Sequence, residues 1–553
     1  MRRTEAGWRL PDLSERQARY LASSEWIPET LGEIVRRRLA QNQDVIAIID
    51  GDRRLTRREW HDAATRLGAA LMRRGLSKGS VVSFQLPNWS EACIISLACS
   101  LYGFVMNPLL PMYRERDLSF ILSQCRSDAL FLPQQFRSTN FRALLSKVEY
   151  PTKREERIFW VRSTSGDGES YEKLLEESGE PIVLPDVDLN DVKVVVYTSG
   201  STGRPKGVLH SHHSLHATVR EAAAFWGIGE SDTLFIPSPV AHIGGSIYAF
   251  EFPWIAGAKA LLMDTWNAAH AATMIDREKA TFCAGATPFL QGLLAAAEEK
   301  KMTLPSLKRF ICGGASVPAS LIERGSAQFQ NCLISRAYGS SEVPIICPGV
   351  RTRADRDYGR TTDGEIRAQI RLVDESGRDA PHGAGGEILA RSPRMFIGYL
   401  DATDEADQFT DDGYFRMGDI GRLVDGRFLE ITGRKKEIII RMGENISPRE
   451  IENMLLSHPA IMQAAVIGVP DERTGERAVA VVTLRQGDSF DFAAMTQVLT
   501  KAGMARQKFP EELHVLQEMP MNSIGKILKQ ELQMRFGAKA AQSAAAHAAG
   551  ARA

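Results

Sequence analysis

The sequence predicts an α/β protein, with a large N-terminal part made of parallel sheets covered by helices plus a β-rich subdomain, followed by a small α+β C-terminal unit. Two observations predict it. Short apolar strands alternate with helical patterns past residue 340, which is typical of parallel sheets with helices on both faces. After about residue 365 the sequence becomes β-rich and is punctuated by glycine. The length of 553 residues also exceeds that of one ordinary domain.

The first elements carry clear local signals. Thr56 and Glu59 form a capping box, and apolar residues recur behind it at helical spacing until Gly75. Residues 80–86 fit a strand, and residues 89–102 fit a buried helix. The alternation that follows supports the parallel-sheet interpretation.

Four strand-to-loop transitions end in small or polar residues that a ligand could approach. They are Val194 to Gly207, Leu234 to Gly245, Phe310 to Val317 and Leu333 to Glu342. In open α/β sheets, ligands bind at the carboxyl ends of the strands. We therefore expect these four loops to border one cleft.

The C-terminal third predicts strands at 366–373, 386–390, 427–432, 437–442, 464–469 and 478–484. A second capping box at Ser447 and Glu450, with proline at the first helical position, opens a helix, and another helix is expected near 492–502. The tail at 537–553 is rich in alanine and has no core-forming face, which predicts disorder.

Composition excludes several classes of function. The chain has 68 basic and 68 acidic side chains, which argues against bulk attraction to nucleic acid or anionic membranes. The most apolar run, 92–106, is shorter than the roughly 20 residues needed to span a bilayer. The seven cysteines of the chain include no C-x-x-C pair, and the N-terminus lacks the apolar core of a signal peptide, so a reduced cytoplasmic protein is expected.

The segment Val194 to Val208 is the most informative stretch. A β-branched run breaks into hydroxyls, glycines and Lys206 before apolar residues return, a pattern that suits a phosphate-holding loop. It is not a Walker A motif, because no Gly-Lys-Ser/Thr occurs at the required spacing. Taken alone, such a loop is more often a flexible surface turn than a phosphate site.

Five motifs in order decide between these alternatives. They are Y-T-S-G-S-T-G-R-P-K-G-V from Tyr197, Y-G-S-S-E from Tyr338, Y-F-R-M-G-D from Tyr414, G-R-K-K-E from Gly433, and P-M-N-S-I-G-K from Pro520. Together they resemble the adenylate-forming superfamily of acyl- and aryl-CoA synthetases, luciferases and peptide-synthetase adenylation domains, from about residue 30 to 532. Phe415 and Met417 depart from the usual third motif without affecting Asp419.

The resemblance implies an ATP-dependent acid–CoA ligase, with ATP, coenzyme A and Mg²⁺ as cofactors and a small carboxylic acid as substrate. The residues implied in nucleotide binding are Thr198, Ser199, Gly200, Ser201, Thr202, Gly203, Lys206, Gly314, Ala315, Tyr338, Gly339, Ser341, Asp419 and Arg434. Glu342 is implied as the magnesium ligand, although in most loops such a residue is a solvated acid.

The resemblance also implies how two half-reactions share one site. Lys526 is expected to neutralise the carboxylate and the α-phosphate during adenylation. The C-terminal domain, 437–535, is then expected to rotate about a hinge at 433–436, with Lys436 as the pivot, away from the N-terminal domain at 1–432. Gly443 matches the glycine beside which pantetheine passes.

The acid is not identified by the sequence. His242 matches a family position that closes the acyl pocket, although a histidine after an apolar strand also fits simple packing. Gly244, Gly245, Gly313 and Gly314 lack side chains, so we infer room for a bulky acyl group. Residues 434–447 most resemble cyclohexanecarboxylate-CoA ligases and short- to medium-chain fatty acyl-CoA synthetases.

Two alternatives remain at this level. A stand-alone adenylation enzyme that loads a carrier protein would carry the same five motifs, and so would an aryl- or steroid-acid ligase. A non-catalytic nucleotide-binding protein would not need both Lys206 and Lys526 together with Glu342. The oligomeric state, including a homodimer, is left open.

Overall fold

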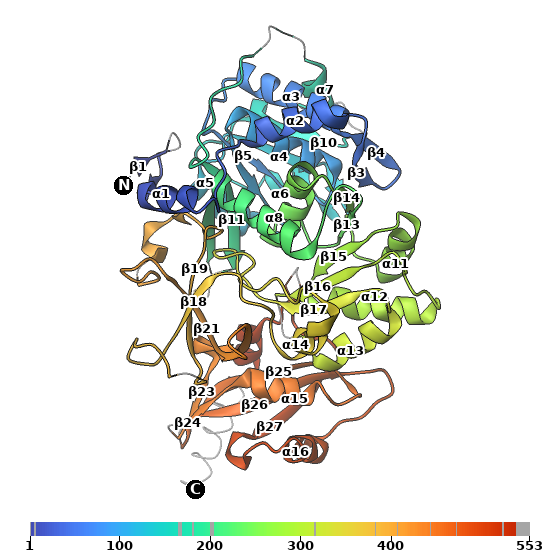
Figure 1. Ribbon diagram of the computed structural model, residues 1–553, viewed down its shortest axis with the longest axis vertical. Coiled ribbons are helices and arrows are strands. Elements are labelled where there is room, and N and C mark those ends of the chain that lie inside the picture. Colours follow the sequence, from blue (N-terminus) through green and yellow to red (C-terminus); the bar gives the residue numbers. More distant parts are fainter. Residues whose placement is uncertain are drawn as a thin grey trace.

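The computed structural model describes residues 2–4, 7–163, 169–177, 179, 182–199, 204–314, 317–381, 383–405, 407–442, 444–471, 473–522 and 525–537. Two seven-stranded sheets make up the blue-to-yellow part of the molecule, and the last strands form the orange and red layer beneath them (Figure 1). The predicted tail at 537–553 lies outside the described residues, apart from Gly537.

The first sheet carries the predicted phosphate loop. Its order is β10 (Ile158–Val161), β7 (Ala129–Pro133), β5 (Val81–Phe84), β6 (Val105–Pro108), β11 (Val192–Ser199), β12 (Pro205–Ser211) and β20 (Gly398–Tyr399). The strands from β10 to β11 run parallel, as predicted, whereas β12 is antiparallel to both of its neighbours, β11 and β20. The apolar residues after the loop therefore return as a strand beside β11.

The second sheet carries the other three predicted loops. Its order is β17 (Leu333–Ala337), β16 (Arg309–Gly313), β15 (Phe282–Gly285), β13 (Thr233–Ile236), β14 (Lys259–Leu262), β3 (Ile46–Asp50) and β4 (Arg53–Thr56). Strands β13, β15, β16 and β17 are neighbours and parallel, so their carboxyl ends share one edge. This supports the expectation that the loops after β13, β16 and β17 border one cleft.

Helices cover both sheets. The longer ones are α1 (Ser14–Ala22), α2 (Leu31–Asn42), α3 (Arg57–Arg73), α4 (Ser90–Tyr102), α5 (Glu115–Cys125), α8 (His212–Trp226), α11 (Ala268–Arg277), α12 (Thr287–Glu299) and α13 (Ala319–Gln328). Short helices are α6 (Phe141–Leu145), α7 (Tyr171–Glu176), α9 (Ile243–Ser246), α10 (Phe252–Ile255) and α14 (Arg356–Thr361), with a π-helix at Ile247–Glu251 between α9 and α10.

The capping prediction for α3 is confirmed. The Thr56 hydroxyl accepts from the Glu59 amide, and the Glu59 carboxylate accepts from the Thr56 amide. Every side chain of α4 is buried, because this helix packs inside the core that joins the two sheets. No helix in the described part of the chain is long and apolar enough to cross a membrane.

The β-rich region and the last part of the chain form two further sheets. One is antiparallel, with the order β18 (Gln369–Val373), β19 (Gly386–Arg391), β21 (Phe415–Val424) and β22 (Phe428–Arg434). The other contains β23 (Ile439–Arg441), β24 (Glu444–Ile446), β25 (Ile461–Asp471), β26 (Gly475–Leu484) and β27 (Glu512–Leu516), packed with α15 (Pro448–Leu455) and α16 (Phe492–Lys501). Strand β27, which no sequence pattern predicted, pairs in parallel with β26.

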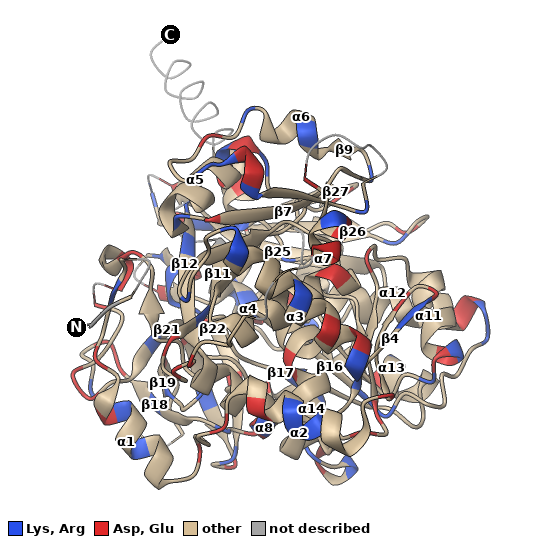
Figure 2. Cartoon of the chain, turned by 90° about the horizontal axis from the view of Figure 1, so that it is seen from above, with Lys and Arg blue, Asp and Glu red and all other residues tan. Residues whose placement is uncertain are grey.

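The second capping box is only half formed. Ser447 accepts from the Glu450 amide at 3.4 Å, but the Glu450 carboxylate binds Lys508 at 2.9 Å. All seven cysteines are buried and free, as expected for small apolar core residues. Segments coloured for acidic and for basic residues are interspersed over the helices seen from above (Figure 2), which agrees with the balanced composition.

Candidate active site

The phosphate-loop hairpin is held by strand pairing. Thr198 lies opposite Lys206 in the β11–β12 register. The Lys206 ammonium is 3.3 Å from Asp404 Oδ1 and 5.2 Å from the centre of the Tyr399 ring. Gly200, Ser201, Thr202 and Gly203 lie outside the described residues, as does the Ser199 side chain. The predicted cation is therefore located, whereas most of the loop that should accompany it is not described.

The predicted magnesium ligand lies next to this hairpin. Tyr399 belongs to β20, which pairs with β12, and its phenol donates to Glu342 Oε1 at 2.8 Å. Burial and then the charge of Glu342 raise the pKa of Tyr399, so the phenol stays a donor. Within the described residues, the Glu342 carboxylate forms no ion pair. A carboxylate without a cation fits Mg²⁺, which commonly takes one or two protein carboxylates plus phosphate oxygens.

His210 connects the phosphate hairpin to the Tyr338–Glu342 loop. Its Nε2 lies 2.7 Å from the carbonyl oxygen of Ser341, and its Nδ1 lies 3.0 Å from the hydroxyl of Ser214. Burial lowers the pKa of His210 to about 4, so the ring is neutral at physiological pH. The buried Ser341 is thereby fixed next to Glu342.

Tyr338, Asp419 and Arg434 form the third part of the site. The Tyr338 phenol donates to Asp419 Oδ2 at 2.7 Å, and Arg434 Nε lies 2.9 Å from Asp419 Oδ1. Residues 419 and 434 are paired across β21 and β22, so the sheet sets this geometry. Asp419 is buried, with both oxygens already aligned by donors, which suits a carboxylate that accepts a pair of hydroxyls.

Lys526 reaches this cluster from the last part of the chain. Its amide donates to Asn522 Oδ1 at 2.8 Å, and the Asn522 amide donates back to its carbonyl, which closes a tight loop. Gly525 in this loop has φ +77°, and a Cβ there would lie 2.7 Å from Cγ of Pro288 in the first turn of α12. The loop therefore packs against the carboxyl edge of the second sheet.

The ammonium of Lys526 lies in an environment that disfavours its positive charge. Burial, followed by the positive charge of Arg434, lowers the pKa of Lys526 from its ordinary value. The negative charges of Glu437 and Asp419 oppose this effect, and the described residues supply no ion pair to Lys526. A partly buried cation next to other cations attracts an anionic ligand.

Two of the four glycines expected to enlarge the acyl pocket, Gly245 and Gly313, have a different role, whereas a Cβ on Gly244 would lie 3.4 Å from the His242 ring, an ordinary contact distance. A Cβ on Gly245 would lie 2.0 Å from the carbonyl oxygen of Pro239, and one on Gly313 would lie 2.7 Å from that of Ala337. Both positions need glycine because backbone fills the space, so the missing side chains do not enlarge a pocket there. Only Gly314, with φ +82° and no described atom within 4 Å of a Cβ, faces open space.

His242 itself caps α9. Its Nδ1 accepts from the Gly244 amide at 3.2 Å, and burial lowers its pKa to about 4. Tyr248, in the π-helix that follows α9, is a core residue, because its ring packs against Trp226, Phe252 and Phe282.

Of the four other predicted positions, two lie among the described residues. Gly339 is exposed, but its backbone approaches Ile345 closely. Lys436 is exposed in the 3₁₀ turn Lys435–Glu437, directly after β22. Ala315 and Gly443 lie outside the described residues.

Sequence reasoning missed Tyr399, His210 and Asp404. Tyr399 follows the apolar run 395–397 and has the pattern of a core residue, while Asp404 lies in a polar run that resembles an ordinary turn. Each acquires its contact from a residue 57 or more positions away, so no local pattern could reveal it.

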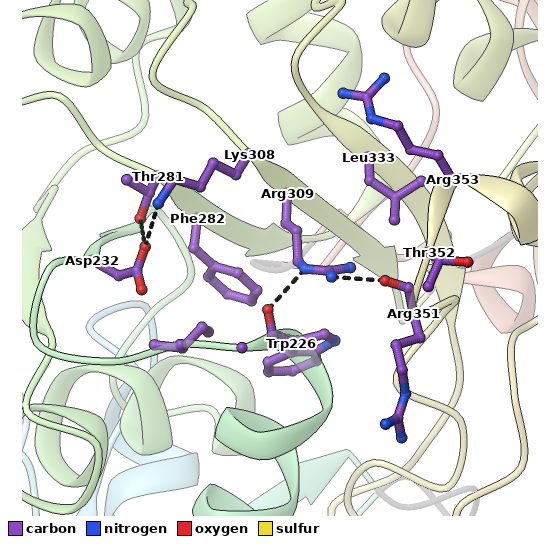
Figure 3. Close-up of a pocket in the computed structure, with 12 residues that line it drawn as sticks. Trp226, Asp232, Thr281, Phe282, Lys308, Arg309, Leu333, Arg351, Thr352 and Arg353 are labelled. Atoms are coloured by element: carbon purple, nitrogen blue, oxygen red, sulfur yellow. Dashed lines mark hydrogen bonds and ion pairs between the residues drawn. The ribbon is translucent and has the colours of Figure 1, made fainter.

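A separate cavity of about 240 Å³ contains none of the predicted residues. It lies at the amino ends of β15, β16 and β17, the edge opposite the candidate site. At its centre Arg309 donates to the carbonyls of Trp226 and Arg351, while the side chains of Arg351 and Arg353 extend to opposite sides (Figure 3). Arg309 thus ties three chain segments together, which is a structural role.

Comparisons with known proteins identify the family of the chain. The AMP-binding enzyme family model matches residues 35–400, and that of the AMP-binding enzyme C-terminal domain matches residues 450–526. The medium-chain fatty-acid–CoA ligase of Escherichia coli is 30% identical over 93% of this chain and 92% of its own. The 3-[(3aS,4S,7aS)-7a-methyl-1,5-dioxo-octahydro-1H-inden-4-yl]propanoyl:CoA ligase of Mycobacterium tuberculosis is 30% identical over 92% of this chain and 98% of its own.

A solved structure has the same fold. ATP-bound MatB from Rhodopseudomonas palustris superposes with a TM-score of 0.81 at 25% identity, covering 92% of this chain and 99% of that one. The predicted α/β architecture and the predicted superfamily are confirmed. The chain belongs to the AMP-binding enzyme family.

Proposed function

We propose that the chain is an AMP-forming acid–CoA ligase. In the first half-reaction an oxygen of the carboxylate attacks the α-phosphorus of ATP, the α–β phosphoanhydride bond breaks, and pyrophosphate leaves. In the second, the sulfur of coenzyme A attacks the carbonyl carbon of the acyl-adenylate and AMP leaves. The relatives named as CoA ligases support this assignment.

The observation that carries the proposal is the position of Lys526. Two anions must meet in adenylation, and their repulsion is the main barrier that a protein can lower. Lys526 is partly buried, has no ion pair within the described residues, and lies near enough to Arg434 and Asp419 for their charges to act on its pKa. It is therefore available to neutralise the carboxylate and the α-phosphate as their bond forms.

The other residues would hold the nucleotide. Thr198 and Lys206 would bind the β- and γ-phosphates, together with Ser199 to Gly203 of the same loop. Asp419 would accept both ribose hydroxyls, while Tyr338, Gly339, Gly314, Ala315 and Arg434 would surround the base and ribose. Glu342 would hold Mg²⁺, which supplies charge neutralisation on the phosphates when it is bound. Ser341 would donate to the α-phosphate.

The second half-reaction requires Lys526 to withdraw, because it guards the carbonyl that the thiol must reach. A rotation of residues 437–535 relative to residues 1–432 about Lys436 would achieve this. Lys436 lies at the exposed end of β22, where a few backbone torsions can change without disturbing a core. The rotation would bring the loop that contains Gly443 to the coenzyme A channel.

The acid is proposed to be medium-chain, alicyclic or otherwise bulky and apolar. This rests on the Escherichia coli and Mycobacterium tuberculosis relatives, since the glycine geometry gives independent support only at Gly314. His242, as the cap of α9 at the same sheet edge, would border the acyl chain. It would act as a neutral residue, because its pKa is about 4.

Pyrophosphate release with a panel of carboxylic acids tests the proposal. Linear C6–C12, alicyclic, aromatic and steroid side-chain acids would be compared, with and without coenzyme A and with a pantetheinylated carrier protein as the alternative acceptor. We expect release that depends on an apolar acid, and a CoA thioester detected by mass spectrometry. A thioester formed only on the carrier protein would replace the ligase assignment with a carrier-loading enzyme.

A further inference from the structure

The two cations of the phosphate hairpin share acidic partners on one short segment. Arg204 Nη2 lies 3.1 Å from Asp401 Oδ2 and 3.2 Å from Asp404 Oδ1. Lys206 Nζ lies 3.3 Å from the same Oδ1 of Asp404. Asp404 belongs to the 3₁₀ turn Ala402–Glu405, almost 200 residues after the hairpin. One carboxylate oxygen therefore compensates both loop cations.

Asp404 and Asp401 differ in how deeply their side chains are buried. The side chain of Asp404 is 8% exposed, whereas that of Asp401 is 29% exposed. A nearly buried carboxylate needs its cations, since the attraction between charges grows as water is excluded. Asp401 is partly solvated, and its oxygens are also held by Thr403. The charge of Asp404 is thus the one that depends on Lys206.

The turn that carries Asp404 is firmly attached. Glu405 accepts from the Tyr399 amide at 2.6 Å, and the Tyr399 phenol donates to Glu342. A Cβ on Gly398 would lie 2.1 Å from Glu405, so the turn packs directly on β20. The contacts of the neighbouring Glu405 hold Asp404 in place. In the ion pair between Asp404 and Lys206, the flexible lysine side chain is therefore the partner that can change its position.

We propose that Asp404 competes with the triphosphate for Lys206. With the site empty, Asp404 holds Lys206 in an ion pair. The β- and γ-phosphates then take the ammonium over, and Asp404 regains it as pyrophosphate leaves. Asp404 is in this way a positioning residue that lowers affinity for pyrophosphate and speeds its release. This rests on the proposed function, because it assumes that the hairpin binds the β- and γ-phosphates.

The test compares Asp404→Asn with the matched control Asp401→Asn, which leaves the Lys206 pair intact. Binding of magnesium pyrophosphate and of AMP to the full chain would be measured by titration calorimetry. We expect Asp404→Asn to bind pyrophosphate about two- to fivefold more tightly, the range for releasing one partly exposed ion pair. AMP, which has no β- or γ-phosphate, should bind with unchanged affinity, and Asp401→Asn should resemble the wild type.

Unchanged or weaker pyrophosphate binding in Asp404→Asn would overturn the inference, as would a parallel loss of AMP binding, which would indicate a structural role. Asp404→Glu keeps the charge and should retain wild-type affinity. It therefore provides a second test if Asp404→Asn fails to fold, and tighter pyrophosphate binding by Asp404→Glu would also overturn the inference. A wild-type chain that binds neither AMP nor MgATP would remove the proposed function itself.

Discussion

Lys193 and Lys206 lie on the same β11–β12 hairpin, and their surroundings differ sharply. Lys193 Nζ is 2.7 Å from Glu251 Oε1, and both side chains are only 2% exposed. Lys206, at the loop end, has an exposed fraction of 18% and lies 3.3 Å from Asp404. A buried pair is costly to break from one side, whereas a pair at the mouth of a site can exchange its partner. The same residue type is thus part of a buried ion pair at one end of the hairpin and of a more exposed pair, with a proposed role in ligand binding, at the other.

Backbone irregularities create the buried pair. Lys193 lies where the β11–β12 register shifts between Val192 and Val194, and Glu251 ends the π-helix Ile247–Glu251. Bulges and π-helices both redirect side chains that regular structure would place elsewhere. The pair connects the strand leading to the phosphate loop with the helix that follows His242, and so it fixes the two halves of the site relative to each other.

The largest expected effect is on stability. Lys193→Met should lower the free energy of unfolding by about 3–5 kcal/mol, because Glu251 is left as an uncompensated buried charge. Lys193→Met combined with Glu251→Leu should recover most of that loss. Thermal unfolding would show a clear drop in Tm for the single variant only. The comparison would fail if Lys206→Met lowered Tm as much.

The second-largest effect is expected at Lys526, a third lysine, which has no ion pair within the described residues. Lys526→Ala should slow acyl-adenylate formation by about 10² or more, since its charge stabilises only the transition state of that step. Thioester formation from a supplied acyl-adenylate should be largely spared. Single-turnover assays of each half-reaction measure the two rates, and an equal fall in both would contradict the role given to Lys526.

A fall in pH should lower the free energy of unfolding, because two buried histidines resist protonation in the folded chain. Burial lowers the pKa of His210, in the same hairpin, and of His242 from 6.5 to about 4. Between these pH values the unfolded chain binds more protons than the folded chain, so stability falls as pH falls. At pH 5 the loss is about 2 kcal/mol for each histidine. Tm should therefore be lower at pH 5 than at pH 7, and an equal Tm at both would refute this.

The smallest effect is expected at the mouth of the site. Lys206→Ala should raise the KM for ATP about tenfold, because a single charged contact to the phosphates would be lost. Tm should fall only slightly, because Arg204 still pairs with Asp404 in this variant. Steady-state kinetics with saturating acid would measure it. The matched control is Lys147→Ala, an exposed lysine that pairs with Glu115 and should leave the KM for ATP unchanged.

Local sequence signals determined much of this protein. The capping box at Thr56, the alternation of strands with helices and the change after residue 365 each reflect interactions within a few residues, which is why periodicity and turn chemistry revealed them. The five motifs predicted a phosphate loop and the candidate positions Glu342, Asp419 and Lys526 for the same reason. Each motif is a short segment with its own chemistry.

Tertiary structure alone decided how those segments are supported. The contacts of Tyr399 with Glu342, His210 with Ser341 and Asp404 with Lys206 join positions 57, 131 and 198 residues apart. The tertiary structure also showed that Gly245 and Gly313 lack side chains because neighbouring backbone atoms fill the space. A sequence pattern records only which residues are close along the chain, whereas burial, charge compensation and available volume depend on which segments meet in space.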